Sequence, residues 1–217
     1  MLTEKTSQCL DGLYSAVICD ALDRLGYRRQ GMTPMIRPLF PEARAFGPAR
    51  TLLSVPKSGF PEKPYEKELE ALDRIGAGDV IVFGTTRDGT AGVWGELLST
   101  AAKAKGCVGV VVDGLTRDAA RICRQGFPVF AEGISPYDSY GRSEVVSYDA
   151  PIECGGVRVA PNDVVFADYD GVVVIPSNAL EEVLSLASEK SSRERVVEQE
   201  FRKGRKVAEV FAEHGIL

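Results

Sequence analysis

Near the start of the chain, apolar residues recur three and four positions apart. This spacing is typical of one face of a helix, and Gly26 follows it where a left-handed cap is expected. The apolar positions are Leu10, Leu13, Tyr14, Val17, Ile18, Ala21, Leu22 and Leu25. The pattern predicts an amphipathic first helix, in which Asp20 is expected to be a structural hydrogen-bonding residue.

The middle of the chain predicts alternating strands and helices. Strands are expected at 45–55, 80–83, 108–112 and 129–131, and helices at 65–75, 96–105 and 117–124. The first of these helices carries four acidic residues that we expect to form a solvated face: Glu66, Glu68, Glu70 and Asp73. The strand–helix–strand alternation favours a parallel sheet with helices packed against it, which is an α/β fold class.

Beyond Tyr137 the chain changes to short β-prone pieces separated by glycine, proline, asparagine and aspartate. The pieces are 144–148, 157–160, 164–167 and 172–175. Tight turns between short strands predict an antiparallel or mixed sheet. From Asn178 onward the pattern is helical and becomes strongly charged between Glu189 and Lys206. Such a polar helix is either solvated or reaches across to another subunit.

Composition narrows the class of protein. The 217 residues, 44% of them hydrophobic, suit one globular domain spanning 1–217. The net charge is −5 and no long Lys/Arg run is present, which disfavours a nucleic-acid partner. The N-terminus lacks the pattern of a signal peptide, and no stretch approaches eighteen uncharged apolar residues. We therefore expect a cytoplasmic protein with no membrane span.

Histidine and cysteine usage excludes several chemistries. The one histidine is His214, three residues before the end, so triad hydrolases and histidine-ligated zinc enzymes are disfavoured. The five cysteines are widely spread, with no C-x-x-C pattern, and are expected to be small core or surface residues. Carboxylate, arginine and backbone chemistry remains.

The most informative segments are 92–98 and 108–118. The first places Gly92 and Gly95 directly before a helix, so free backbone N–H groups and the positive end of the helix dipole can receive a carboxylate or phosphate. The second ends a buried strand with adjacent Arg117 and Asp118, at the strand end where open α/β sheets bind ligands. Arginine can grip a carboxylate or carbonyl, and aspartate can hold a hard divalent cation such as Mg²⁺. Together they can organise an enolate.

Spacing alone leaves simpler interpretations open. Arg117 and Asp118 can equally form a helix cap with a surface ion pair, and Glu96 can be a first-turn acid that complements the helix dipole. Asp113, four residues before Arg117, is similarly ambiguous and is left outside the predicted site, as is Asp20.

Several stretches resemble the family of regulator of ribonuclease activity A-like (RraA-like) proteins, which includes 4-hydroxy-4-methyl-2-oxoglutarate/4-carboxy-4-hydroxy-2-oxoadipate aldolases. They are AVICDALDRLG at 16–26, GPARTL at 47–52, GELL at 95–98, AKAKGCVGVVVDGLTRD at 102–118, GFPVFAEGISP at 126–136 and CGGVRVAPNDVVFADYDGVVVIP at 154–176. The resemblance covers nearly the whole chain. It implies a swivelling β/β/α single domain with N- and C-terminal helices.

The resemblance also implies roles for individual residues. Aldolases of this family carry an acidic residue, twenty intervening residues and then Arg-Asp, a spacing that Glu96, Arg117 and Asp118 reproduce. Asp118 is then the direct ligand of Mg²⁺ or Mn²⁺, Arg117 binds the pyruvyl oxygens, and residues Gly95, Glu96, Leu97 and Leu98 offer backbone N–H groups to the substrate carboxylate. Glu96 holds metal-bound water, although the family's residue at this position is aspartate.

A further glutamate is implied from the C-terminal helix of a neighbouring subunit. We assign it to Glu194, with Glu198 as the alternative and a solvated charged face as the simpler interpretation of both. The tail from about 178 to 217 is accordingly expected to contact another subunit of a homotrimer or homohexamer.

The implied activity is that of a class II pyruvate aldolase. It cleaves 4-hydroxy-2-oxo acids to pyruvate through a metal-stabilised enolate, and oxaloacetate decarboxylation follows as a side activity from the same enolate. The alternative is a non-catalytic regulator that binds and inhibits a ribonuclease.

Overall fold

The computed structural model describes residues 12–86 and 89–216, so Cys9 and Leu10 of the sequence predictions lie outside the described residues. Its helices are α2 (Ser15–Arg24), α3 (Glu66–Asp73), α4 (Glu96–Ala104), α5 (Ala119–Gln125), a short 3₁₀ helix (Ser177–Ala179), α6 (Leu180–Arg202) and α7 (Val207–His214). Its strands are β1 (Arg37–Pro38), β2 (Ala45–Pro56), β3 (Val80–Gly84), β4 (Gly92–Trp94), β5 (Gly109–Thr116), β6 (Val129–Ile134), β7 (Ser143–Tyr148), β8 (Ile152–Cys154), β9 (Val157–Val159), β10 (Val164–Ala167) and β11 (Val172–Ile175).

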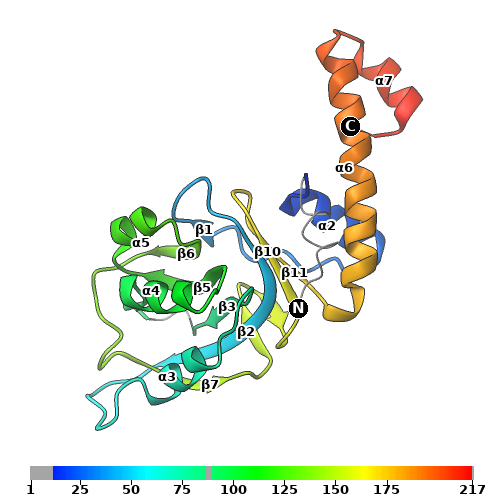
Figure 1. The fold of residues 1–217 in the computed structure, drawn as a ribbon. Helices are drawn as coiled ribbons and strands as arrows, with labels where there is room; N and C mark the ends of the chain where they lie inside the picture. The colour runs from blue at the N-terminus through cyan, green and yellow to red at the C-terminus, as the bar shows by residue number, and fades with distance from the viewer. Residues whose placement is uncertain (1–11, 87–88, 217) are drawn as a thin grey trace.

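Most of these strands form one mixed sheet. Its order is β1-β6-β5-β3-β2-β10-β11, with β4 added beside β5 and β7 beside β2. The strands β2, β3, β5 and β6 run parallel, as the alternation predicted, whereas β7 and β10 join β2 antiparallel. The long, curved β2 links the parallel strands to the antiparallel ones, because it pairs with β3 on one side and with β7 and β10 on the other (Figure 1). The predicted mixed α/β class is confirmed.

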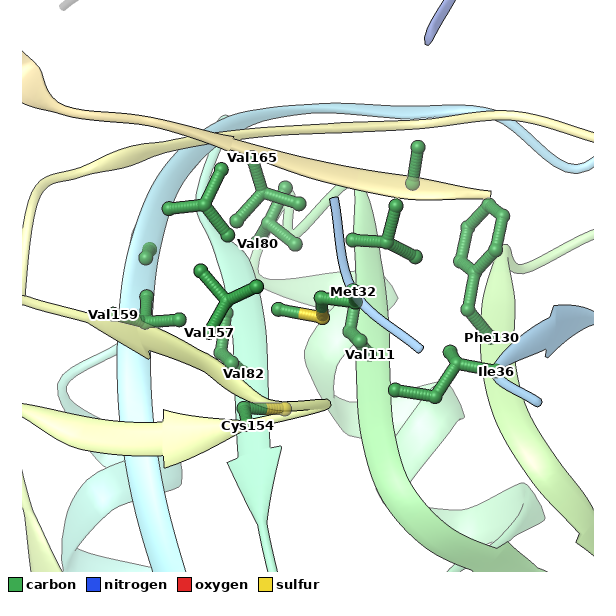
Figure 2. Packing of buried hydrophobic residues seen from close by; sticks show 14 of the residues in the cluster. Met32, Ile36, Val80, Val82, Val111, Phe130, Cys154, Val157, Val159 and Val165 are labelled. Carbon is green, nitrogen blue, oxygen red and sulfur yellow. The ribbon is translucent and has the colours of Figure 1, made fainter. Parts of the chain in front are cut away.

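Alternation along the strands fixes three apolar layers. In β3, Val80 and Val82 face the layer shown in Figure 2, which the hairpin β8-β9 covers, while Ile81 and Phe83 face α3, α4 and α5. Val165 of β10 points into the first layer, and Phe166 points to α2 and α6. Because both faces of the sheet are covered, its central strands consist of continuous apolar runs rather than alternating ones.

Several predicted boundaries change in the structure. The strand predicted at 108–112 extends to Thr116, and the helix predicted from Arg117 begins at Ala119. Asp118 has φ 57°, a left-handed conformation that ends the strand and starts the helix abruptly. The strands β1, β4 and β8 were not predicted, because two or three residues show little periodicity. The equally short β9 was predicted from the turn residues on either side of it.

The solvated face predicted for the helix at 65–75 is wrong in one position. Glu68 is only 6% exposed and shares the buried side of α3 with Ala71 and Leu72. The spacing 68, 71 and 72 is that of a single helix face, so periodicity within this helix carried the signal. A prediction based on the acidic composition of the helix overlooked it.

The C-terminal helices leave the body of the molecule. The start of α6 packs with α2 on β10 and β11, and its end projects outward with α7 folded back against it (Figure 1). Gly204, at φ 78°, lies in the turn between them. Although α6 is 23 residues long, no helix among the described residues has the length and apolar character needed to cross a membrane.

Candidate functional site

Pairing between β4 and β5 brings the two sequence motifs together. Trp94 pairs with Thr116, and the backbone N–H of Arg117 donates to the carbonyl oxygen of Trp94 at 2.8 Å. The hydroxyl of Thr116 donates to the same oxygen, also at 2.8 Å. As a result, the N-terminus of α4, which follows β4, lies directly beside the Arg117–Asp118 pair that ends β5.

Glycine is required at this junction because the two chain segments approach closely. A Cβ atom on Gly95 would lie 2.7 Å from Oδ2 of Asp118, and one on Gly92 would lie 2.8 Å from Cβ of Arg117. Real Cβ atoms do not make such short contacts. The glycines that the sequence placed before a helix therefore create the space that the Arg117 and Asp118 side chains occupy.

Asp118 interacts with the positive end of α4. Its Oδ2 atom accepts a hydrogen bond from the backbone N–H of Glu96 at 3.2 Å and lies 3.4 Å from Nε of Arg117. Asp118 is also the N-cap residue of α5, but its side chain makes no capping hydrogen bond there. The carboxylate is thus directed at α4 rather than at its own helix, and about a third of its side chain is exposed.

Arg117 bridges two carboxylates. In addition to Asp118, its Nη1 atom lies 3.1 Å from Oδ1 of Asp138, a residue in the loop before β7 that sequence reasoning missed. Partial burial by itself raises the pKa of Asp138, but the backbone N–H of Tyr140 and the charge and hydrogen bond of Arg117 outweigh it and lower this pKa. Asp138 therefore stays ionised and holds the guanidinium in place.

Glu96 points toward α5. Its Oε2 atom lies 2.9 Å from Nη1 of Arg121, and this hydrogen bond raises the pKa of Arg121. Glu96 also stands in the first turn of α4, where an acid complements the helix dipole. Its predicted contact with metal-bound water stays a prediction.

A cavity of about 290 Å³ opens over this junction. Its lining residues are Tyr65, Glu68, Leu69, Gly92, Val93, Trp94, Gly95, Leu97, Leu98, Arg117, Asp118, Asp138 and Ser139. Apolar walls with a few converging polar groups are typical of small-molecule sites. Of the predicted site residues, Gly95, Leu97, Leu98, Arg117 and Asp118 thus line one cavity, whereas Glu96 is not among its lining residues.

The cavity suits a divalent cation that keeps most of its water ligands better than one coordinated mainly by protein side chains. Among the described residues, no group of three or more His, Cys, Asp or Glu side chains is arranged to hold a metal ion. Mg²⁺ commonly binds through one or two carboxylates and keeps several waters. Asp118, part-exposed in the wall of this cavity, meets that requirement.

Glu194 lies on α6 rather than in this cavity. Its carboxylate accepts a hydrogen bond from the hydroxyl of Tyr14 and lies 3.7 Å from Nζ of Lys190. Burial, followed by this contact, raises the pKa of Tyr14 to about 12. The alternative, Glu198, pairs with Arg202 at 2.6 Å. A role for either at the cavity of another subunit stays a prediction.

The two aspartates left outside the predicted site have other partners. Oδ2 of the buried Asp113 accepts the backbone N–H of Gly155 at 2.8 Å, which joins β5 to the turn of the β8-β9 hairpin. Asp20 is exposed and pairs with Lys190 across the α2–α6 contact. Both contacts connect elements of the fold.

Comparison with known proteins identifies relatives of this chain. The RraA-like family model, described as Aldolase/RraA, matches residues 15–174. A protein of Halalkalibacterium halodurans that carries the provisional name 4-hydroxy-4-methyl-2-oxoglutarate aldolase is 34% identical over 184 residues, which is 83% of this chain and 82% of that protein. Protein DlpA of Legionella pneumophila is 33% identical over 174 residues, 79% of this chain but only 27% of that much longer protein.

A solved structure shares the fold. RraAS2 of Streptomyces coelicolor, described as an unusual member of the RNase ES inhibitor RraA protein family, superimposes with a TM-score of 0.79 at 31% identity, over 94% of this chain and 98% of that one. The fold expected from the resemblance, an RraA-like α/β fold with N- and C-terminal helices, is confirmed.

Proposed function

Because the chain belongs to the RraA-like family, we propose that it is a divalent-metal-dependent lyase of the class II pyruvate aldolase type. The proposed substrates are 4-hydroxy-2-oxo acids such as 4-hydroxy-4-methyl-2-oxoglutarate, after the name of the Halalkalibacterium halodurans relative. The observation that carries the proposal is the placement of Arg117, Asp118 and the N-terminus of α4 around one cavity. Arg117 can bind an anion, Asp118 can ligate a cation, and the N-terminus of α4 can bind a carboxylate.

The residues divide the work of binding an oxo acid. Arg117, held by Asp138, presents its planar guanidinium to the 2-oxo and carboxylate oxygens. The N–H groups of Leu97 and Leu98 belong to the first turn of α4, where helix donors lack an intrahelical acceptor, and they face the substrate carboxylate. Asp118 would hold Mg²⁺ or Mn²⁺, which would supply Lewis-acid stabilisation of the negative charge that develops on the oxo acid.

The assembly is part of this proposal. Glu194 is proposed to act at the cavity of a neighbouring subunit in a homotrimer or homohexamer, which suits an arm that projects from the body (Figure 1). The same enolate forms when oxaloacetate loses carbon dioxide, so a decarboxylase side activity accompanies the aldolase.

The proposal is tested by pyruvate release from 4-hydroxy-4-methyl-2-oxoglutarate and from oxaloacetate. We expect turnover with Mg²⁺ or Mn²⁺, loss of turnover with a chelator, and recovery when the metal is restored. Asp118→Ala is expected to abolish both activities at every metal concentration, and Asp73→Ala, an exposed aspartate of α3, serves as the control. Turnover of neither substrate with any divalent metal would refute the lyase assignment.

A second candidate function is inhibition of a ribonuclease, the activity named for the family of the Streptomyces coelicolor structure. Likeness over 94% of the chain favours it. This function requires a binding surface and no metal, so Asp118→Ala is expected to leave it unchanged. Ribonuclease activity measured with and without the wild-type protein, in the presence of chelator, separates the two functions.

A further inference from the structure

A buried carboxyl group that the proposed function does not use lies in the wall of the candidate cavity. Glu68 of α3 is 6% exposed, and no hydrogen bond or ion pair joins its carboxyl group to another of the described residues. Buried carboxyl groups are normally partnered, because an unpaired one loses its hydration without compensation. An unpartnered one facing a ligand cavity indicates a role toward the ligand.

Glu68 faces the same space as the substrate-binding groups. It lines the cavity that Arg117 and Asp118 also line, and it borders an adjoining cavity between α3 and β7. Besides Glu68, the charged and titratable groups that line the first cavity are Tyr65, which is the N-cap residue of α3, Arg117, Asp118 and Asp138. Those that line the second are Tyr65, Glu66, Lys67, Tyr140, and Lys57 paired with Glu144. Glu68 is the buried acid among them.

Resting on the proposed function, we propose that Glu68 carries the proton between the 4-hydroxyl oxygen and C3 of the substrate. In the cleavage step the 4-hydroxyl proton moves to the Glu68 carboxylate, the O–H electron pair forms the new C=O bond at C4, and the C3–C4 bond pair passes into the pyruvate enolate. The protonated Glu68 then returns this proton to C3, which completes the methyl group of pyruvate and restores the carboxylate. No further reactant is needed.

The alternative proton carriers in the cavity are less suitable. Asp138 is ion-paired with Arg117, and its pKa is lowered, so it is a weak base. Burial raises the pKa of Tyr65 from a value that is already high, so its phenolate is scarce at neutral pH. Burial, with a smaller effect of Asp138, raises the pKa of Glu68 to about 7. A group with a pKa near the working pH is well matched to accept and return a proton.

Two substrates separate this role from the rest of the mechanism. Aldol cleavage requires removal of a hydroxyl proton, whereas oxaloacetate loses carbon dioxide without one. Both reactions leave an enolate that can also take its C3 proton from water, so the comparison isolates the removal of the hydroxyl proton. For Glu68→Gln we expect kcat for the 4-hydroxy-2-oxo acid to fall by about 100-fold or more, and decarboxylation to fall by less than about five-fold, since proton transfer by a positioned group contributes roughly 10² to 10⁴. The control is Glu70→Gln on the same helix, whose carboxylate is exposed and bonded to Tyr148.

A pH profile of the wild-type enzyme tests the same idea without a variant. We expect kcat/KM for aldol cleavage to rise through about pH 7 and the decarboxylation profile to lack this limb. Any of three results would overturn the proposal while leaving the lyase assignment intact. They are a cleavage profile without this limb, equal losses of both reactions in Glu68→Gln, and cleavage by folded Glu68→Gln within about three-fold of wild type. Failure of the wild type on both substrates would overturn the lyase and this proposal together.

Discussion

Two glutamates in different regions of the molecule show how position decides the chemistry of one residue type. Glu68 lies in the cavity wall, where burial raises its pKa to about 7. Glu200 lies in the outer arm, residues 198–214, where hydrogen bonds from Arg205 at 2.8 Å and Lys203 at 2.7 Å lower its pKa to about 2. The Glu68 carboxyl group is largely buried and has no cation beside it, whereas the Glu200 carboxyl group has two cations.

The contrast extends to the surroundings of the two residues. In the outer arm, acids and bases pair with one another along and between α6 and α7, as Glu198 does with Arg202 and Glu213 with Arg205. In the cavity, Arg117 and Asp118 are part-exposed and face open space beside Glu68. Charges that are satisfied within the protein stabilise a helix pair, whereas charges left facing a cavity are available to a ligand.

The largest effect is expected from Arg117. Replacing it with Ala removes the anion grip and leaves Asp118 and Asp138 without their shared cation, so kcat/KM should fall by about 10³. Arg117→Lys keeps the charge but not the planar fork, and only a small part of the activity should return. Steady-state pyruvate release measures both. Arg124→Ala, an exposed arginine of α5, is the control, and equal activity in all three variants would contradict the assigned grip.

A smaller effect on activity is expected from Gly95→Ala. The new Cβ atom would press on Oδ2 of Asp118 at 2.7 Å, and a displaced carboxylate should lower kcat/KM by about 10 to 100-fold while raising the metal concentration needed for half-activity. In Gly76→Ala, by contrast, the Cβ meets its nearest atom at an ordinary 3.6 Å. If Gly95→Ala needed no more metal than the wild type for half-activity, Asp118 would not be the metal ligand.

Stability should respond to pH through Glu68. Its folded-state pKa of about 7 exceeds the ordinary glutamate pKa of 4.5, so the unfolded chain releases this proton first as the pH rises. The associated stability is fully present below about pH 4.5 and is lost as the pH rises through about 7, by on the order of 3 kcal/mol at most. Urea unfolding at pH 4.5 and pH 8 should show this loss in the wild type and a reduced loss in Glu68→Gln. Identical pH dependence in both proteins would place the carboxyl in contact with water.

The smallest effect, with the opposite dependence on pH, belongs to Glu200. Its folded-state pKa is lowered, so the stabilisation is present above the unfolded pKa and is lost as the pH falls from about 4.5 toward 2. Glu200→Gln should lower the melting temperature by a few degrees at most at pH 7, because exposed ion pairs contribute little, and should leave kcat unchanged. A large loss of activity in Glu200→Gln would contradict this and show that catalysis depends on the conformation of the outer arm.

The sequence anticipated much of the candidate site because its parts are local. Gly95 and Glu96 stand next to each other, as do Arg117 and Asp118, and strand–helix alternation indicated that each pair lies where a strand ends or a helix begins. Glu68 of α3 was wrongly predicted to be solvated because its environment is not local. The burial of Glu68 depends on how α3 packs against β7. The four acidic residues of α3 suggested a solvated face, and this outweighed the helical spacing that places Glu68 on the same face as Ala71 and Leu72.

Taken by itself, the sequence determined the parallel strands, the helices between them and the glycines at the β4–α4 junction, because periodicity and backbone freedom are properties of neighbouring residues. Only the tertiary structure decided that Asp138 holds Arg117, that the carboxylate of Asp118 faces α4, and that Glu68 shares their cavity. These contacts join residues from separate elements, through the pairing of β4 with β5 and the packing of α3 on β7. The pattern of residues along the chain does not specify distances between separate elements, whereas strand pairing and helix packing in the folded protein do.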